Sequence, residues 1–307
     1  MSKYQLKRLK MHKRFTEHFP KLSSVVADAL LPIIDSEMFD GILSQSDIQM
    51  LKSKTGLNDD ELALSLLPIA AAYAVVPISK FQVGAIARGI SGAWYFGGNM
   101  EFFHTPLQQT IHAEQCAITH AWMSGEKGLE TITVNYTPCG HCRQFMTELN
   151  SERALKISLP GRPVATLNDY LPDSFGPRDL GITKLLLDST NNHYVDNSKD
   201  DLGSIAIKSA NISHAPYTGS HSGVALRTKS GKTFCGSYAE NAAYNPSIPP
   251  LQAAIIMMYI KAGEDEIVEK VILAEKINPL ITQANATKEL NSALGSDNFK
   301  VISLDIN

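Results

Sequence analysis

One imidazole and two thiols form the pattern in this 307-residue sequence that indicates metal chemistry. His112 opens the segment His112-Ala113-Glu114, and Cys139 and Cys142 follow 27 and 30 residues later in Pro138-Cys139-Gly140-His141-Cys142. Imidazole nitrogen and thiolate sulfur are ligands that Zn²⁺ takes, and three protein ligands leave one tetrahedral position open to water. The pattern therefore predicts a catalytic zinc site, with one Zn²⁺ per subunit.

Glu114 lies two residues after His112. Helical side chains at this spacing do not share a face, so the Glu114 carboxylate is poorly placed as a fourth ligand beside the imidazole. A carboxylate next to the metal could instead take up and return protons. We therefore expect Glu114 to be the catalytic acid and base.

Two other interpretations of the cysteine pair stay open. A Cys-x-x-Cys pair in a reducing compartment also forms redox centres. A structural zinc site would need a fourth ligand, for which His104, His120 and His141 are the nearby candidates. His141 lies inside the Cys-x-x-Cys turn, where it has little freedom to reach back. The three-ligand count favours catalysis over both alternatives.

The composition is that of a globular chain with a small-molecule partner. Hydrophobic residues make up 44% and charged residues 19% of the sequence, enough apolar surface for two cores. The net charge is −3 and no basic face is apparent, so nucleic acid is not favoured as a partner. No run of about 18 apolar residues or signal peptide predicts a membrane span or export. Two of the four cysteines are assigned to zinc, which leaves no disulfide framework and favours the cytoplasm.

Helices are expected to lead into the site. We expect residues 1–14 to be a frayed basic terminus, followed by helices over 15–31 and 46–54, the second capped by Ser46. A third helix begins near Asp59, kinks at Pro68 and ends before Pro77.

The elements that would position the ligands alternate between strand and helix. The expected order is a hairpin over 81–87 and 93–96, a helix over 111–123 capped by Thr110, a strand over 130–136, a helix starting at Pro138 and a strand over 155–159. Such alternation builds an α/β fold of three layers, a mixed sheet with helices on both faces. The metal would then lie at two helix N-termini, where partial positive charge favours the thiolates.

The second half of the sequence repeats the first at an offset of 139 residues. The matched pairs are Pro77 and Pro216, Gly84 and Gly223, Gly97 and Gly236, and Glu101 and Glu240. At this offset His112 falls on Leu251, Glu114 on Ala253, Cys139 on Asn278 and Cys142 on Ile281, so the second copy should not bind zinc. Coincidence is the alternative, since turn glycines recur in unrelated folds. We predict an N-terminal helical segment (1–57), a catalytic domain (58–180) and a degenerate repeat (190–307), separated by a connector rich in Pro, Gly, Asp, Asn and Ser.

From about residue 11 onward, the chain closely resembles the two-domain bacterial cytidine deaminases of the zinc-dependent cytidine and deoxycytidylate deaminase family. The H-x-E and P-C-x-x-C pattern is a known signature of zinc nucleobase deaminases. The resemblance is carried by Phe81-Gln82-Val83-Gly84-Ala85, Asn99-Met100-Glu101, His112-Ala113-Glu114-Gln115, Asn135-Tyr136-Thr137-Pro138-Cys139-Gly140-His141-Cys142 and Ser237-Tyr238-Ala239-Glu240-Asn241.

This resemblance implies the roles of the site residues. His112, Cys139 and Cys142 would hold zinc, and Glu114 would move protons. Asn99 and Glu101 would bind the ribose hydroxyls and Phe81 would pack against the pyrimidine, with Met100 and Ala113 completing the substrate-binding set. The implied activity is hydrolysis of cytidine and 2′-deoxycytidine to uridine and 2′-deoxyuridine in pyrimidine salvage, by a homodimer. Without the resemblance, Asn99 is typical of a turn and Glu101 of a solvated surface.

Two other functions remain possible at this point. A deaminase acting on nucleotides or polynucleotides would need cationic groups for phosphate, which a carboxylate such as Glu101 would repel. A non-enzymatic zinc scaffold would use the second copy to bind a partner. Release of ammonia from cytidine distinguishes the scaffold from an enzyme.

Overall fold

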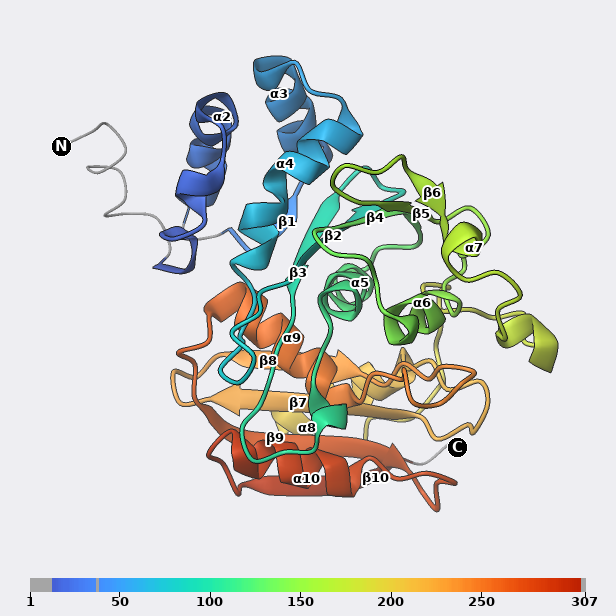
Figure 1. Cartoon of the computed structure of the whole chain (residues 1–307). Coiled ribbons are helices and arrows are strands. Elements are labelled where there is room, and N and C mark those ends of the chain that lie inside the picture. The colour runs from blue at the N-terminus through green and yellow to red at the C-terminus, as the bar shows by residue number, and fades with distance from the viewer. Residues whose placement is uncertain (1–12, 37–38, 305–307) are drawn as a thin grey trace.

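The computed structural model describes residues 13–36 and 39–304 and contains two mixed β-sheets, each with helices packed on it (Figure 1). The first sheet has the strand order β1 (Ile42–Leu43), β3 (Trp94–Gly98), β2 (Gly84–Gly89), β4 (Leu129–Val134), β5 (Lys156–Ser158) and β6 (Ala165–Thr166). The second has the order β10 (Phe299–Leu304), β9 (Val268–Lys276), β7 (Ser222–Thr228) and β8 (Thr233–Ser237). In each sheet one pair is parallel, β4 with β5 and β9 with β10. We call the two parts of the chain that carry these sheets the first half and the second half.

Helices connect and cover the strands. Before the first sheet lie the 3₁₀ turns η1 (Lys13–Phe15) and η2 (Phe19–Lys21) and the helices α2 (Ser24–Ile34) and α3 (Gln45–Thr55). The first half carries α4 (Asp59–Ala71), η3 (Leu107–Gln109), α5 (Ala113–Met123), α6 (Gly140–Met146), α7 (Leu167–Tyr170) and η4 (Pro177–Leu180). The second half carries α8 (Asp201–Asn211), α9 (Pro250–Ala262) and α10 (Ala284–Ala293). None of the helices over the described residues is long and apolar enough to cross a bilayer.

Helices cover both faces of the first sheet. A Cβ on Gly84 would lie 2.3 Å from the backbone nitrogen of Ala71 in α4, and one on Gly97 would lie 2.4 Å from that of Ala117 in α5. Gly97 pairs with Ala85, the neighbour of Gly84, and successive strand residues point to opposite faces. The helices α4 and α5 therefore pack on opposite faces, and the predicted three-layer α/β/α architecture is confirmed.

The second half repeats this architecture residue by residue in its strands. The pairs Ala85 with Val134 and Gly89 with Leu129 of β2 and β4 recur 139 positions later as Val224 with Leu273 and Thr228 with Val268. Even the bulge between Arg88 and Gly89 recurs, between Arg227 and Thr228. The predicted duplication is therefore present in the fold.

The offset is not constant, and this corrects part of the sequence-based alignment. Met100 bridges Ile111 in the first half and Ala239 bridges Ile248 in the second, so the loop before α9 is two residues shorter. His112 therefore corresponds to Pro249, and not to Leu251, while Glu114 corresponds to Leu251, and not to Ala253. Surface loops tolerate such deletions, and α9, at 13 residues against 11 in α5, restores the register by β9. With this corrected alignment the second half still lacks a counterpart of the His112 ligand, because Pro249 cannot bind zinc.

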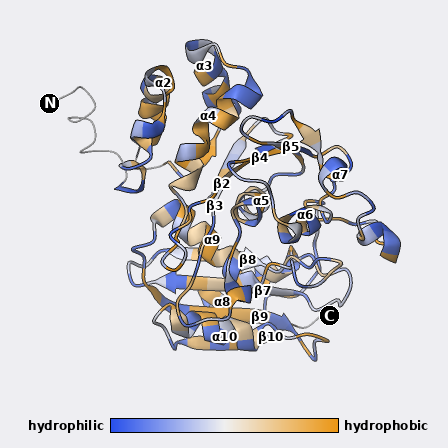
Figure 2. Ribbon diagram, in the orientation of Figure 1, coloured by the Kyte–Doolittle hydropathy of each residue, from blue (hydrophilic) through white to orange (hydrophobic). Residues whose placement is uncertain are grey.

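The two halves pack against each other through α5 and α9. Gln115 Nε2 donates to the Pro246 carbonyl at 2.9 Å, and Gln252 Nε2 donates to the Gln109 carbonyl at 3.1 Å. The two bonds are equivalent in the repeat, because Gln252 lies 137 residues after Gln115 and Pro246 lies 137 residues after Gln109. Eleven consecutive residues of α9 are buried, which suits a helix that is apolar all round (Figure 2). One hydrophobic cluster runs from the N-terminal helices through α4 to α9, so the halves share a core.

Several element boundaries differ from the prediction. Ser44, and not Ser46, caps α3, because its hydroxyl and the Asp47 carboxylate form a capping box. The expected helix over 15–31 is interrupted at Leu22 and Ser23, whose backbone is extended, so α2 starts only at Ser24. The expected frayed terminus lies mostly outside the described residues. Its last two residues, Lys13 and Arg14, belong to a 3₁₀ turn and are not frayed.

Candidate active site

Two helix N-termini bring the three predicted zinc ligands together. His112 is the N-cap residue of α5, the role that we expected for Thr110, and Cys139 is the N-cap residue of α6. Cys142 lies in the first turn of α6. The chain reaches α6 directly from β4, and α5 packs on the neighbouring strands β2 and β3, so both helices start at the same edge of the sheet (Figure 1).

The distances between the three ligand atoms fit a tetrahedral zinc ion. His112 Nδ1 lies 3.4 Å from Cys139 Sγ and 3.3 Å from Cys142 Sγ, and the two sulfurs are 3.7 Å apart. Zinc bound at usual bond lengths would require about 3.8 Å between the sulfurs and about 3.5 Å between sulfur and nitrogen. Among the described residues, this is the one group of three or more His, Cys, Asp or Glu ligand atoms found within 4.8 Å of one another. The side chains present therefore fit zinc, with Nδ1 as the imidazole ligand.

The contact between the two thiols shifts the pKa values of Cys139 and Cys142 in opposite directions. Hydrogen bonds from Cys142 and His112 lower the pKa of Cys139 to about 3. The bond to Cys139, together with burial, raises the pKa of Cys142 well above its usual range. Zinc takes both sulfurs as thiolates, so its binding must release the proton of Cys142.

Glu114 lies beside the ligands without joining them. Its side chain is only 5% exposed and contacts Cys142, but its oxygens are not part of the three-residue ligand group. Burial raises the pKa of Glu114, and the contact with Cys142 opposes that shift. A buried carboxyl group whose pKa is raised above its usual value is suited to accept and return a proton.

Asn99 and Glu101 both hold the loop that carries Phe81. Asn99 Oδ1 accepts from the Val83 amide at 2.8 Å and its Nδ2 donates to the Phe81 carbonyl at 2.9 Å. Glu101 Oε2 accepts from the Ile78 and Ser79 amides at 3.0 and 2.9 Å, and Oε1 accepts from the Ser79 hydroxyl. Burial would raise the pKa of Glu101, but the hydrogen bonds from these residues outweigh it and lower the pKa.

The carboxylate arrangement of Glu101 recurs in the half that lacks zinc ligands. Glu240 Oε2 accepts from the Tyr217 and Thr218 amides at 2.9 and 3.1 Å, and Oε1 accepts from the Thr218 hydroxyl at 2.7 Å. Glu240 is fully buried, whereas Glu101 is partly exposed. A cavity of about 570 Å³ lies beside this network, and its lining includes Tyr238, Pro249 and Ile281, the counterparts of Asn99, His112 and Cys142. The loop bonds of Glu101 are thus part of the scaffold and do not by themselves indicate substrate binding.

Two exposed aromatic rings lie together, one on the loop before β2 and one on the loop after β4. Phe81 and Tyr136 are each 50% exposed, with ring centroids 4.7 Å apart. We did not predict a role for Tyr136, although its position between β4 and the cysteine turn could have indicated one. Met100 and Ala113, by contrast, are buried, and the backbone of Met100 pairs with Ile111.

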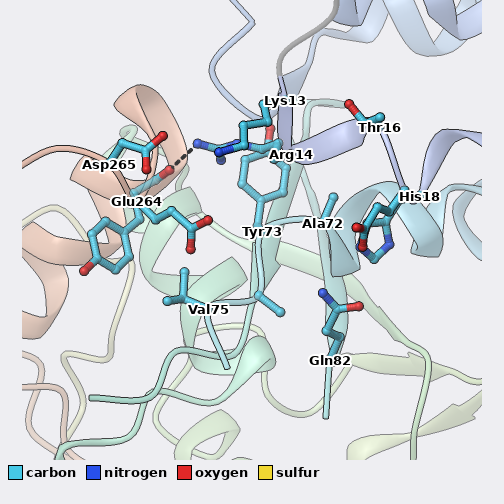
Figure 3. A pocket seen from close by; sticks show the side chains of 13 residues that line it. Lys13, Arg14, Thr16, His18, Ala72, Tyr73, Val75, Gln82, Glu264 and Asp265 are labelled. Atoms are coloured by element: carbon cyan, nitrogen blue, oxygen red, sulfur yellow. Dashed lines mark hydrogen bonds between the residues drawn. The ribbon is translucent and has the colours of Figure 1, made fainter. Parts of the chain in front are cut away.

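A second cavity, of about 410 Å³, lies at the junction of the N-terminal segment with α9 (Figure 3). Arg14 Nη2 donates to the Tyr259 carbonyl at 2.7 Å, and its guanidinium lies 4.6 Å from the centre of the Tyr73 ring. Cationic groups are favoured at helix C-termini, so Arg14 fastens the segment to the end of α9. None of the predicted site residues lines this cavity.

Two family models and two relatives that match nearly the whole chain indicate the same protein family. Family models described as the cytidine and deoxycytidylate deaminase zinc-binding region match residues 57–156 and 167–288. The cytidine deaminase of Proteus mirabilis (strain HI4320) is 55% identical over 295 residues, which cover 96% of this chain and 100% of that protein. The cytidine deaminase of Serratia proteamaculans (strain 568) is 53% identical over 292 residues, covering 95% and 99%. A crystal structure of cytidine deaminase from Mycobacterium tuberculosis shares 32% identity with a TM-score of 0.36, covering 39% of this chain and 99% of that chain.

Proposed function

The chain belongs to the cytidine and deoxycytidylate deaminase family, and we propose that His112, Cys139, Cys142 and Glu114 form its catalytic centre. It is a zinc-dependent enzyme that deaminates cytidine. The observation that carries the assignment of the centre is the triangle of ligand atoms, whose edges of 3.3–3.7 Å fit tetrahedral zinc, with the buried Glu114 carboxyl beside it.

The residues divide the reaction between them. Zinc, when bound by the triad, lowers the pKa of water to about 7 and so supplies the nucleophile. Glu114 accepts a proton from the attacking water and delivers it to N3 of the pyrimidine, which makes C4 more electrophilic. Once the bond from C4 to oxygen has formed, Glu114 takes the second proton of the former water from that oxygen and gives it to the amino group. The bond from C4 to nitrogen then breaks, ammonia leaves and a carbonyl remains at C4.

The surrounding side chains favour a free nucleoside as substrate. The exposed rings of Phe81 and Tyr136 offer apolar surface to a pyrimidine, and the partly exposed Glu101 carboxylate can accept hydrogen bonds from ribose hydroxyls. The same carboxylate would repel a phosphate group. We therefore propose 2′-deoxycytidine as a second substrate and place the enzyme in pyrimidine salvage. The cytoplasm suits its four cysteines, all free.

Ammonia release from cytidine, 2′-deoxycytidine and cytidine monophosphate, compared side by side, tests this proposal. Both nucleosides should be turned over with a much larger kcat/KM than the nucleotide. A preference for cytidine monophosphate or for single-stranded DNA would indicate the alternative substrates. A zinc-loaded protein that releases no ammonia from any of them would be a scaffold.

Replacing Glu101 by glutamine should impair catalysis more than it impairs folding. A lost hydrogen bond to a charged group costs about 1.5–3 kcal/mol, so kcat/KM for cytidine should fall about 10- to 150-fold. Glu240→Gln is the matched control, because Glu240 makes the same loop contacts in the half that lacks zinc ligands. If both variants lose equal amounts of activity and melting temperature, Glu101 has only the scaffold role.

We further propose the division of the chain into 1–57, 58–180 and 190–307, and a homodimer in which residues 237–250 cover the partner's zinc site. The helix after them, α9, is the other cover that we expected, but eleven of its residues are already buried within its own chain. The loops that lead into α5 and α9 support an interface, since each carries large exposed apolar side chains: Phe103 at 54%, Leu107 at 79% and Tyr244 at 61%. Such a cover would exclude water beyond the one that reacts. Only two zinc ions should bind per dimer.

A protein truncated to residues 1–188 should be nearly inactive. Truncation would remove α9 from the hydrophobic cluster that it shares with α4 and the N-terminal helices and would expose the apolar surface of α5. Size-exclusion chromatography, zinc content and ammonia release together check this expectation. A soluble monomer with full activity on cytidine would refute any requirement for the second half.

A further inference from the structure

We propose that Glu148 is a positioning residue through which the second half of the chain holds the zinc-binding helix α6. The inference rests on the proposed zinc triad. Glu148 lies two residues beyond the end of α6, and its side chain is fully buried. Its carboxylate lies outside the group of zinc-ligand atoms, so any effect on the metal must pass through the helix.

Among the described residues, the hydrogen-bond partners of the Glu148 carboxylate all belong to the second half. Oε1 accepts from the Tyr217 hydroxyl at 2.7 Å and faces His214 Nε2 at 2.8 Å, and Oε2 accepts from the Ala242 amide at 3.1 Å. A second contact reinforces the first, since Asn241 Nδ2 donates to the Gln144 carbonyl of α6 at 3.0 Å. Carboxylate bonds of this kind are strong and directional, and a buried carboxylate without them would be costly. The end of α6 is therefore fixed to the second half.

Helix α6 needs such external supports. Its seven residues are too few for a stable isolated helix, so tertiary contacts set its position. Arg143 supplies one support within the first half, donating to the carbonyls of Pro138 at 2.8 Å and Tyr170 at 2.7 Å. Glu148 supplies the other. Cys139 and Cys142 lie at the N-terminal end of this supported helix, and their sulfurs already have the separation that zinc requires.

The repeat shows that the carboxylate is specific to the zinc-binding half. The corresponding helix of the second half is α10, where the offset is no longer fixed at 139 residues, because Ile132 pairs with Ile157 in the first half but Val271 pairs with Phe299 in the second. The one carboxylate of α10, Glu289, is exposed, so no buried carboxylate of this helix takes the place of Glu148. A contact needed only to join the two halves would be required equally on both sides of their interface. The charged anchor is instead found where a helix must hold metal ligands.

Two variants test the proposal from opposite sides of the interface. Glu148→Gln keeps the side-chain volume but cannot accept from all three donors, and Tyr217→Phe removes one donor without changing the first half. Both full-length proteins should still bind one zinc per chain but release it to a chelator about 2- to 30-fold faster, the range of networks that couple separated sites. The cobalt-substituted proteins should show shifted thiolate absorption bands, and kcat should fall while KM changes little.

Ile207→Ala is the control for a general loss of stability, because Ile207 lies in a separate core cluster of the second half. Thr287→Val controls for the loss of a buried polar group from α10, the corresponding helix of the second half. Unchanged zinc release and cobalt spectra in both Glu148→Gln and Tyr217→Phe would overturn the proposal, as would equally fast release from Ile207→Ala at the same loss of melting temperature. If Glu148→Gln does not fold, Tyr217→Phe alone decides. Zinc release and the cobalt spectra need no substrate, so they test this proposal independently of the activity on cytidine.

Discussion

Glu114→Gln is expected to bind zinc with the wild-type stoichiometry while cytidine turnover falls about 10²- to 10⁴-fold, the usual contribution of general acid and base catalysis. The side chain lies outside the group of ligand atoms, so its amide leaves the triad intact. The amide cannot carry the proton from water to the pyrimidine. Metal analysis and ammonia release on the same preparation measure both effects.

Glu126→Gln is a matched control, since Glu126 is also buried but contacts Ser91 and Tyr95. It should keep its catalytic constants even if its stability falls. Loss of zinc from Glu114→Gln would show that Glu114 is a ligand, and undiminished turnover would remove it from the mechanism.

Cys139→Ala should lose zinc and with it all measurable deamination. Cys139 is exposed, so the substitution removes little packing, but two remaining ligands are too few for a stable protein zinc site. Local stability should also fall in so far as zinc binding supports the fold. Cys235→Ala is the control, because Cys235 is a free thiol on β8 outside the triad. Stoichiometric zinc in Cys139→Ala would contradict the assignment of the ligands.

The sequence predicted the triad because its chemistry is local. His112 and the cysteine turn each lie at the N-terminus of a helix. The fold brings these two helix N-termini to the same edge of the sheet. Single-sequence patterns could not locate the two-residue deletion before α9, because nothing in a surface loop marks a missing residue. The four residue pairs that revealed the duplication all lie before α9, so the deletion did not hide it. The same constant offset, carried past the deletion, misplaced the counterpart of His112.

The contacts that sequence reasoning missed join residues far apart in the chain. Glu148 meets His214 and Ala242 across 66 and 94 residues, and no periodicity relates them. Tyr136 became notable only when Phe81 was found beside it. For Glu101 the residue type suggested a ligand contact, but its loop bonds and their repetition at Glu240 show that the same carboxylate also has a structural task.

The central claim is that one zinc ion, held by the first half alone, supports hydrolysis of cytidine. The most direct test measures zinc content and ammonia release from cytidine for the full chain, before and after removal of the metal by a chelator. We predict one zinc per chain, equal amounts of ammonia and uridine, loss of both on chelation and recovery when one equivalent of zinc is returned. Full activity in protein shown to be free of metal, or a second zinc ion in the half where Pro249 replaces His112, would contradict the account.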